Sequence, residues 1–114
     1  MVVSEYKYDN ALAERHLVNI LHENKSLEQA ISNLMDTIYR IKASQDCEAL
    51  MRTINKKKLA LVEQKIPEIS EEVTYLDQRI RASFKYPSMR TIQELSKLHS
   101  RCVQTWNMIQ TELR

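Results

Sequence analysis

Hydrophobic side chains recur along this chain at alternating intervals of three and four residues, in three separate stretches. This heptad spacing is typical of helices that pack along one narrow stripe, as in coiled coils and helical bundles. We call the three stretches seams 1, 2 and 3. Seam 1 comprises Leu17, Ile20, Asn24, Leu27, Ile31, Leu34, Ile38 and Ile41; seam 2 comprises Leu59, Val62, Ile66, Ile69, Val73, Leu76 and Ile80; and seam 3 comprises Ile92, Leu95, His99, Cys102, Trp106, Ile109 and Leu113.

The three seams predict an all-α fold, an elongated coiled coil or helical bundle of three or four long helices in which a helical hairpin is expected. A flexible N-terminal segment is expected at residues 1–9, followed by a single helical region at residues 10–114. The helices of this region are predicted at about residues 10–43, 47–84 and 88–114.

The predicted ends of these helices rest on a change of phase and on two prolines. Between seams 1 and 2 the heptad positions become polar, so the chain either turns at about residues 43–46 or continues as one helix with a rotated buried face. The turn is the preferred interpretation. Seam 2 keeps its phase through Pro67, which predicts a kink in the helix. Pro87 is followed by Ser88, a good N-cap, and a break between helices is predicted there.

The chain has no glycine in 114 residues, although average usage of about 7% would give roughly eight. Phosphate-binding loops, dinucleotide-binding turns and nucleophile elbows all need glycine, so these catalytic and cofactor motifs are excluded. The sequence also lacks the spaced Cys and His pairs of zinc sites and the His-Glu-x-x-His motif. We therefore expect a protein that is not an enzyme, with no cofactor, metal or small-molecule substrate.

Charge and cysteine content bear on the binding partners and the cellular location of such a protein. The net charge of +2, from 17 basic and 15 acidic residues, is too balanced to predict binding to nucleic acid or to an anionic membrane. No apolar stretch is long enough for a transmembrane helix, and the polar N-terminus does not look like a secretory signal. Two cysteines, Cys47 and Cys102, do not make a disulfide framework. A reducing location, cytoplasmic or nuclear, is expected.

Two polar positions interrupt the seams. Asn24 occupies an a position of seam 1, where a buried amide is expected to fix the register or the choice of partner. The alternative is that Asn24 faces solvent at a loosely packed turn. His99 and Cys102 lie three residues apart in seam 3 and could offer two metal ligands, but a structural zinc site needs about four. Packing roles for both residues are the preferred interpretation.

Two further features bear on binding. Trp106 in seam 3 is expected to anchor a core or an interface, since large aromatic side chains carry much of the energy of protein interfaces. The densest basic patch comprises Arg52, Lys56, Lys57 and Lys58. This patch could contact an anionic surface such as a microtubule, a phosphate or a lipid, or it could be an ordinary solvated helix face.

Short segments resemble subunits of three helical families. The segment His22-Glu23-Asn24-Lys25 resembles the snapin family of vesicle-tethering subunits, and Glu68-Ile69-Ser70-Glu71-Glu72 resembles the smallest shoulder subunits of dynactin. The segment Glu94-Leu95-Ser96 after Pro87 is similar to a short subunit of the spindle and kinetochore-associated complex. These resemblances imply one class of protein rather than one family: small, non-catalytic helical subunits of intracellular assemblies.

The predicted helices are longer than a compact domain of this size, so their ends should project and bury the seams against other chains. We therefore expect the seam residues, His99 excepted, to bind other helical subunits. The chain would then be a structural or adaptor subunit of an intracellular hetero-oligomeric complex, of a cytoskeletal, kinetochore or vesicle-tethering kind. The alternative is a self-contained helical module whose basic patch contacts microtubules, nucleic acid or anionic membranes. A homodimeric coiled coil is the third option.

Overall fold

The computed structural model of the chain describes residues 2–43 and 56–113, and the side chains of residues 11–43 and 58–113. Three helices make up most of this part of the chain, and it contains no β-strand. Helix α1 covers Val2–Ala43, α3 covers Lys56–Ser83 and α4 covers Met89–Leu113. The predicted all-α fold class is confirmed for the described residues.

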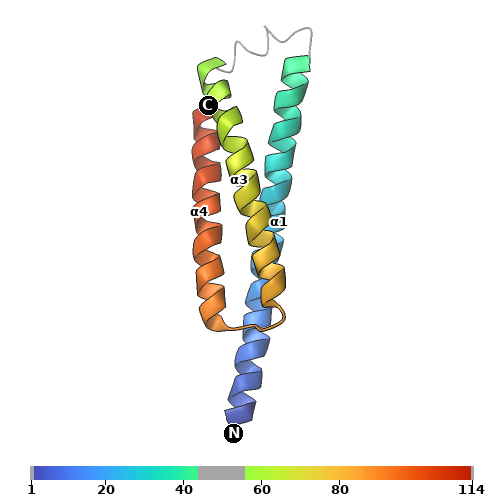
Figure 1. Cartoon of the computed structure of the whole chain (residues 1–114), viewed down its shortest axis with the longest axis vertical. Helices are drawn as coiled ribbons and strands as arrows, with labels where there is room; N and C mark the ends of the chain where they lie inside the picture. Colours follow the sequence, from blue (N-terminus) through green and yellow to red (C-terminus); the bar gives the residue numbers. More distant parts are fainter. Residues whose placement is uncertain (1, 44–55, 114) are drawn as a thin grey trace.

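The three helices lie side by side along one long axis. Helix α3 runs antiparallel to both α1 and α4, which are parallel to each other (Figure 1). The molecule measures 68 × 19 × 16 Å and has a radius of gyration of 18.6 Å, against about 13 Å for a compact domain of this length. Helix α1 is the longest, and its N-terminal end extends past the connection between α3 and α4 (Figure 1).

Helices α3 and α4 are separated at Pro87, where the sequence predicts a break. Helix α3 ends in a tightened turn, in which Phe84 N–H donates to the Arg81 carbonyl at 3.3 Å. Ser88 then caps α4, because its Oγ accepts a hydrogen bond of 3.2 Å from the Thr91 N–H. The predicted N-cap at Ser88 is confirmed. No described residue has a positive φ, so this connection needs no glycine.

Other predicted boundaries differ from the observed helices. Helix α1 begins at Val2, so it includes residues 2–9, which were expected to form a flexible segment. No proline or glycine interrupts these residues, and nothing in them ends a helix. Helix α3 continues through Pro67, as the unbroken phase of seam 2 predicts, and the kink expected there stays a prediction. The predicted turn at residues 43–46 and the predicted helix start at residue 47 fall within 44–55, outside the described residues.

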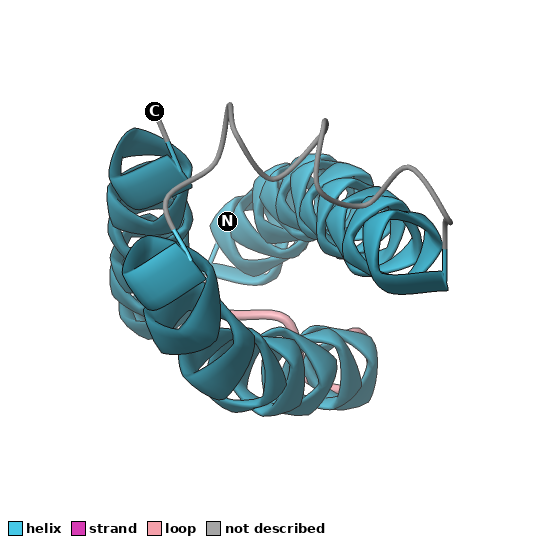
Figure 2. Cartoon of the chain, turned by 90° about the horizontal axis from the view of Figure 1, so that it is seen from above, coloured by secondary structure: helices cyan, strands magenta, loops and turns pink. Residues whose placement is uncertain are grey.

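The three seams converge on one hydrophobic core inside the chain. The view down the bundle shows the three helices arranged around a common axis (Figure 2). Leu17 of α1, Ile69 of α3 and Leu95 of α4 have no exposed surface at all. Burying an aliphatic side chain of this size stabilises a fold by about 1.5–3 kcal/mol. The core is therefore built almost entirely from aliphatic side chains at the heptad positions.

Candidate functional site

Nearly all of the seam residues that we expected to bind other chains are buried within this chain. The buried ones are Leu17, Ile20, Asn24, Leu27, Ile31, Ile38 and Ile41 of α1; Leu59, Val62, Ile66, Ile69, Val73, Leu76 and Ile80 of α3; and Ile92, Leu95, Cys102 and Ile109 of α4. Leu34, Trp106 and Leu113 are the exceptions, because each keeps part of its surface exposed. Helices of the same chain cover the seams, so these residues form its core.

The three exceptions line the same groove, between α1 and α4. Leu34 comes from α1, and Trp106 and Leu113 come from α4 at a spacing of one heptad. The groove has a volume of about 450 Å³. Its remaining lining residues are Ala30, Asn33, Thr37 and Gln110, so none of the described residues gives it a charged side chain. We call it the α1–α4 groove.

The direction of the helices explains why this groove is open. Helices α1 and α4 diverge toward their C-terminal ends, in both the side view and the view from above (Figures 1 and 2). Nearer the middle of the bundle the two helices are in contact, and His99 Nε2 lies 3.5 Å from Glu23 Oε2. Near its C-terminal end α1 keeps contact with α3 through the ion pair between Lys42 and Glu63. The seam of α4 is therefore left partly uncovered where α1 moves away.

Asn24 lies in the core between α1 and α3. Its side chain has no exposed surface, so the alternative in which it faces solvent is wrong. Its Nδ2 donates a hydrogen bond of 3.1 Å to the Val73 carbonyl of α3, while its Oδ1 is buried without a hydrogen-bond partner among the described residues. Its expected role in fixing the register between two helices stays a prediction. The hydrogen bond that would fix this register joins α1 to α3 of the same chain.

The unpartnered oxygen of Asn24 leads to a testable expectation. Replacing Asn24 by leucine should raise the free energy of unfolding by about 1 kcal/mol, because a buried acceptor without a partner costs about 1–3 kcal/mol and one hydrogen bond returns about 1. Urea unfolding followed by circular dichroism measures this difference. A less stable Asn24→Leu chain would show that the bond to Val73 contributes more than the buried oxygen costs.

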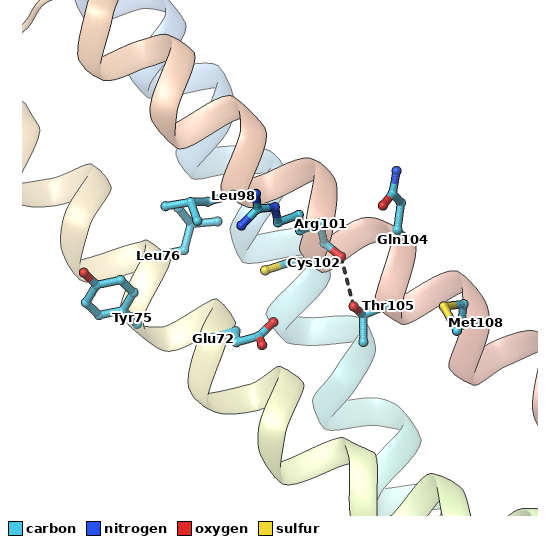
Figure 3. A pocket seen from close by; sticks show the side chains of 9 residues that line it. All are labelled: Glu72, Tyr75, Leu76, Leu98, Arg101, Cys102, Gln104, Thr105 and Met108. Atoms are coloured by element: carbon cyan, nitrogen blue, oxygen red, sulfur yellow. Dashed lines mark hydrogen bonds between the residues drawn. The ribbon is translucent and has the colours of Figure 1, made fainter.

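A second groove lies between α3 and α4, and we call it the α3–α4 groove (Figure 3). Its volume is about 430 Å³. The buried side chains of Leu76 and Cys102, with the half-buried Leu98, contribute the apolar part of its lining. Tyr75 of α3 and Met108 of α4 also line it, although they are 54% and 59% exposed. The three seams do not predict this groove, although apolar residues outside the seams are a signal for it.

Cys102 contributes a buried thiol to the α3–α4 groove. Burial raises the pKa of this thiol above its ordinary value, and the nearby Glu72 carboxylate raises it further. The thiol therefore stays protonated at neutral pH, and a protonated thiol is a poor nucleophile. The part of the chain that the structure describes contains no group of three or more His, Cys, Asp or Glu side chains able to hold a metal ion. Cys102 and His99 occupy packing positions in this bundle.

The basic patch falls largely on residues whose side chains lie outside the described part. Arg52 is among residues 44–55, and the structure places Lys56 and Lys57 at the start of α3 without describing their side chains. Lys58 is exposed. Its expected contact with an anionic surface stays a prediction.

A membrane-spanning helix would need a long apolar stretch, and none of the helices in the described part of the chain has one. No protein-family model, curated protein or solved structure gives a significant match to the chain.

Proposed function

We propose that this chain is a non-catalytic structural or adaptor subunit of an intracellular hetero-oligomeric complex, and that it binds a helix of a partner protein in the α1–α4 groove. One observation carries the proposal. Leu34, Trp106 and Leu113 are the seam residues, among those expected to bind partners, that the chain's own helices leave partly exposed, and they meet in one groove.

The position of the groove between two helices suits a third helix packed against both. The described part of the chain forms three helices with one partly uncovered seam, and a further helix laid between α1 and α4 would give a four-helix arrangement with them. Such a helix would bury the remaining exposed surface of Trp106. Indole rings in pockets of this kind are frequent anchors of protein interfaces, because they bury a large area at little cost in side-chain entropy.

The lining of the groove also indicates the chemistry of the bound helix. Around the three apolar side chains lie the amides of Asn33 and Gln110 and the hydroxyl of Thr37, and none of the described lining residues is charged. Thr37 already donates to the Asn33 carbonyl, and Asn33 Oδ1 accepts from Gln29, so the Asn33 Nδ2 and the Gln110 amide are the groups left to bond a partner. An ionised side chain directed into this groove would lose water without gaining an opposite charge. The partner helix should therefore present a stripe of apolar and small polar residues, with its charged residues facing solvent.

Site-specific crosslinking tests the proposal. A photoreactive amino acid placed at Thr37, on the rim of the groove, should crosslink the chain in its native cells to a helical segment of another protein. The same group at Gln78, on the exposed face of α3, should not crosslink to that segment. A synthetic peptide with the crosslinked sequence should then bind the purified chain. If the crosslinks from Thr37 map only to non-helical segments, or if the peptide does not bind, the proposed function is wrong.

The alternative, a module that grips an anionic surface through the basic patch, predicts a different outcome. Replacing Lys56, Lys57 and Lys58 by glutamate would then abolish binding to microtubules, nucleic acid or lipid vesicles. We expect the same variant to keep full affinity for the partner helix, because the described residues that line the α1–α4 groove all come from α1 and α4, whereas these lysines begin α3.

A further inference from the structure

The α3–α4 groove carries charges of opposite sign on its two sides. Glu72 of α3 and Arg101 of α4 both line it and project from the two helices that border it (Figure 3). Glu68 is exposed one turn before Glu72 on α3, and Lys97 is exposed one turn before Arg101 on α4. In the middle of the groove the α3 side is thus acidic and the α4 side is basic. At both ends the polarity is reversed, because Lys65 and Arg79 of α3 pair with Glu112 and Glu94 of α4.

These charges are only partly used within the chain. Two ion pairs join α3 to α4 at the two ends of the groove, Lys65 with Glu112 at 2.6 Å and Arg79 with Glu94 at 4.0 Å. Between these ends, Glu72 and Arg101 make no ion pair with any described residue.

The same stretch exposes apolar surface. Arg79 covers part of it, because its guanidinium lies 5.9 Å from the centre of the Tyr75 ring and donates a hydrogen bond of 3.2 Å to the Tyr75 hydroxyl. Tyr75 and Met108 stand beside the buried Leu76 and Cys102 with more than half of their own surface in water. Leu61 is exposed two heptads before Tyr75, on the same side of α3. An apolar strip with charges along both sides is the usual composition of a helix-packing interface.

We propose that the α3–α4 groove is the interface through which two copies of this chain form a symmetric dimer. A two-fold axis parallel to the helices would place α3 of one copy against α4 of the other. Rotation about this axis shifts no residue along the bundle, so each residue of the second copy lies at the height that it has in the first. Each Glu72 would then face Arg101 of the second copy, and the interface would contain this contact twice. Charge complementarity therefore favours a second copy as the occupant, because its own α3 and α4 supply both signs.

This dimer is separate from the proposed function, which uses the other side of α4. Leu98, Arg101, Thr105 and Met108 border the α3–α4 groove, whereas Trp106, Gln110 and Leu113 border the α1–α4 groove. A dimer would leave both α1–α4 grooves open, and it would bind two partner helices at once. If the two partner helices belong to one assembly, the second would bind at a raised effective concentration.

Charge reversal tests the dimer. We expect sedimentation equilibrium to give the mass of two chains for the unaltered protein. Arg101→Glu alone and Glu72→Arg alone should each weaken dimerisation about tenfold or more, because like charges would then face each other twice. An equimolar mixture of the two variants should restore the affinity, since every contact in the mixed dimer again joins opposite charges.

The controls separate dimerisation from folding. Arg15→Glu changes an exposed charge on α1 by the same amount and should leave the dimer affinity unchanged. Circular dichroism should show equal helix content in all variants, because Glu72 and Arg101 form no ion pair within the described chain. A chain that sediments as a monomer at every concentration, or a mixture of variants that is no tighter than either variant alone, would overturn the proposal.

Discussion

Replacing Leu95 by alanine is expected to lower the free energy of unfolding of the isolated chain by about 2–5 kcal/mol. Leu95 lies on α4 with no exposed surface and belongs to the single core that all three helices share. The substitution removes buried methyl and methylene groups and leaves a cavity, since the packed helices around Leu95 close in only partially. Small domains are stable by about 5–15 kcal/mol in total, so the loss would be a large fraction.

Urea unfolding followed by circular dichroism measures this loss, with Val18→Ala as the control. Val18 is on α1 and is 54% exposed, so its truncation should change the stability by about 0.5 kcal/mol or less. If Leu95→Ala unfolds with the same midpoint as the unaltered chain, then seam 3 does not pack against the chain's own helices. The seam would in that case be free to bind a different chain, as the sequence pattern alone allows.

Replacing Trp106 by alanine is expected to weaken binding of the partner helix by about 2–4 kcal/mol, which is a loss of roughly 30- to 1000-fold in affinity. The indole lies half-buried between α1 and α4, where it would contact a helix placed in the groove. Truncation would remove the largest side chain that lines the groove. Trp106→Phe should lose much less, because it keeps an aromatic ring in the same place.

Isothermal titration of the crosslinked partner segment into each variant measures these affinities. Met108→Ala is the matched control, since Met108 lies two residues farther along α4 and borders the α3–α4 groove instead. We expect this control to bind the segment as tightly as the unaltered chain does. Equal affinities for Trp106→Ala and the unaltered chain would place the partner on another surface.

The helices and their buried faces could be predicted from the sequence because both follow from local spacing. Every seam residue from Leu59 to Ile80 is buried on α3, and Ser88 caps α4 after Pro87. A heptad seam does not say which helix covers it, since a helix of the same chain and a helix of another chain present the same apolar stripe. For that reason the sequence predicts an interface between chains where the structure has a core.

The grooves depend on features that a seam does not encode. The α1–α4 groove arises because α1 and α4 diverge, and their directions result from packing along the whole bundle. Trp106 stood out in the sequence as an anchor, but its place beside Leu34 required the structure. The α3–α4 groove lies beside the heptad core positions, where Tyr75 and Met108 fall outside the repeat that defines the seams.

The structure also shows how a chain without glycine connects α3 to α4. It excluded glycine-dependent loops from the start, and the described chain makes its α3–α4 connection without any residue at positive φ. A tightened last turn ending at Ser83, and the Ser88 cap, achieve the reversal of direction instead. The chain therefore presents its side chains from helices, and its candidate binding surfaces lie between helices.

The emission of Trp106 tests most directly whether a helix binds in the α1–α4 groove. Trp106 is the only tryptophan of the chain, so its fluorescence reports on this groove alone when the added segment contains no tryptophan. We predict that saturating amounts of the partner segment shift the emission to shorter wavelength and protect the indole from quenching by acrylamide, because the helix excludes water from it. A segment that binds by calorimetry but leaves the emission and the quenching unchanged would contradict this account.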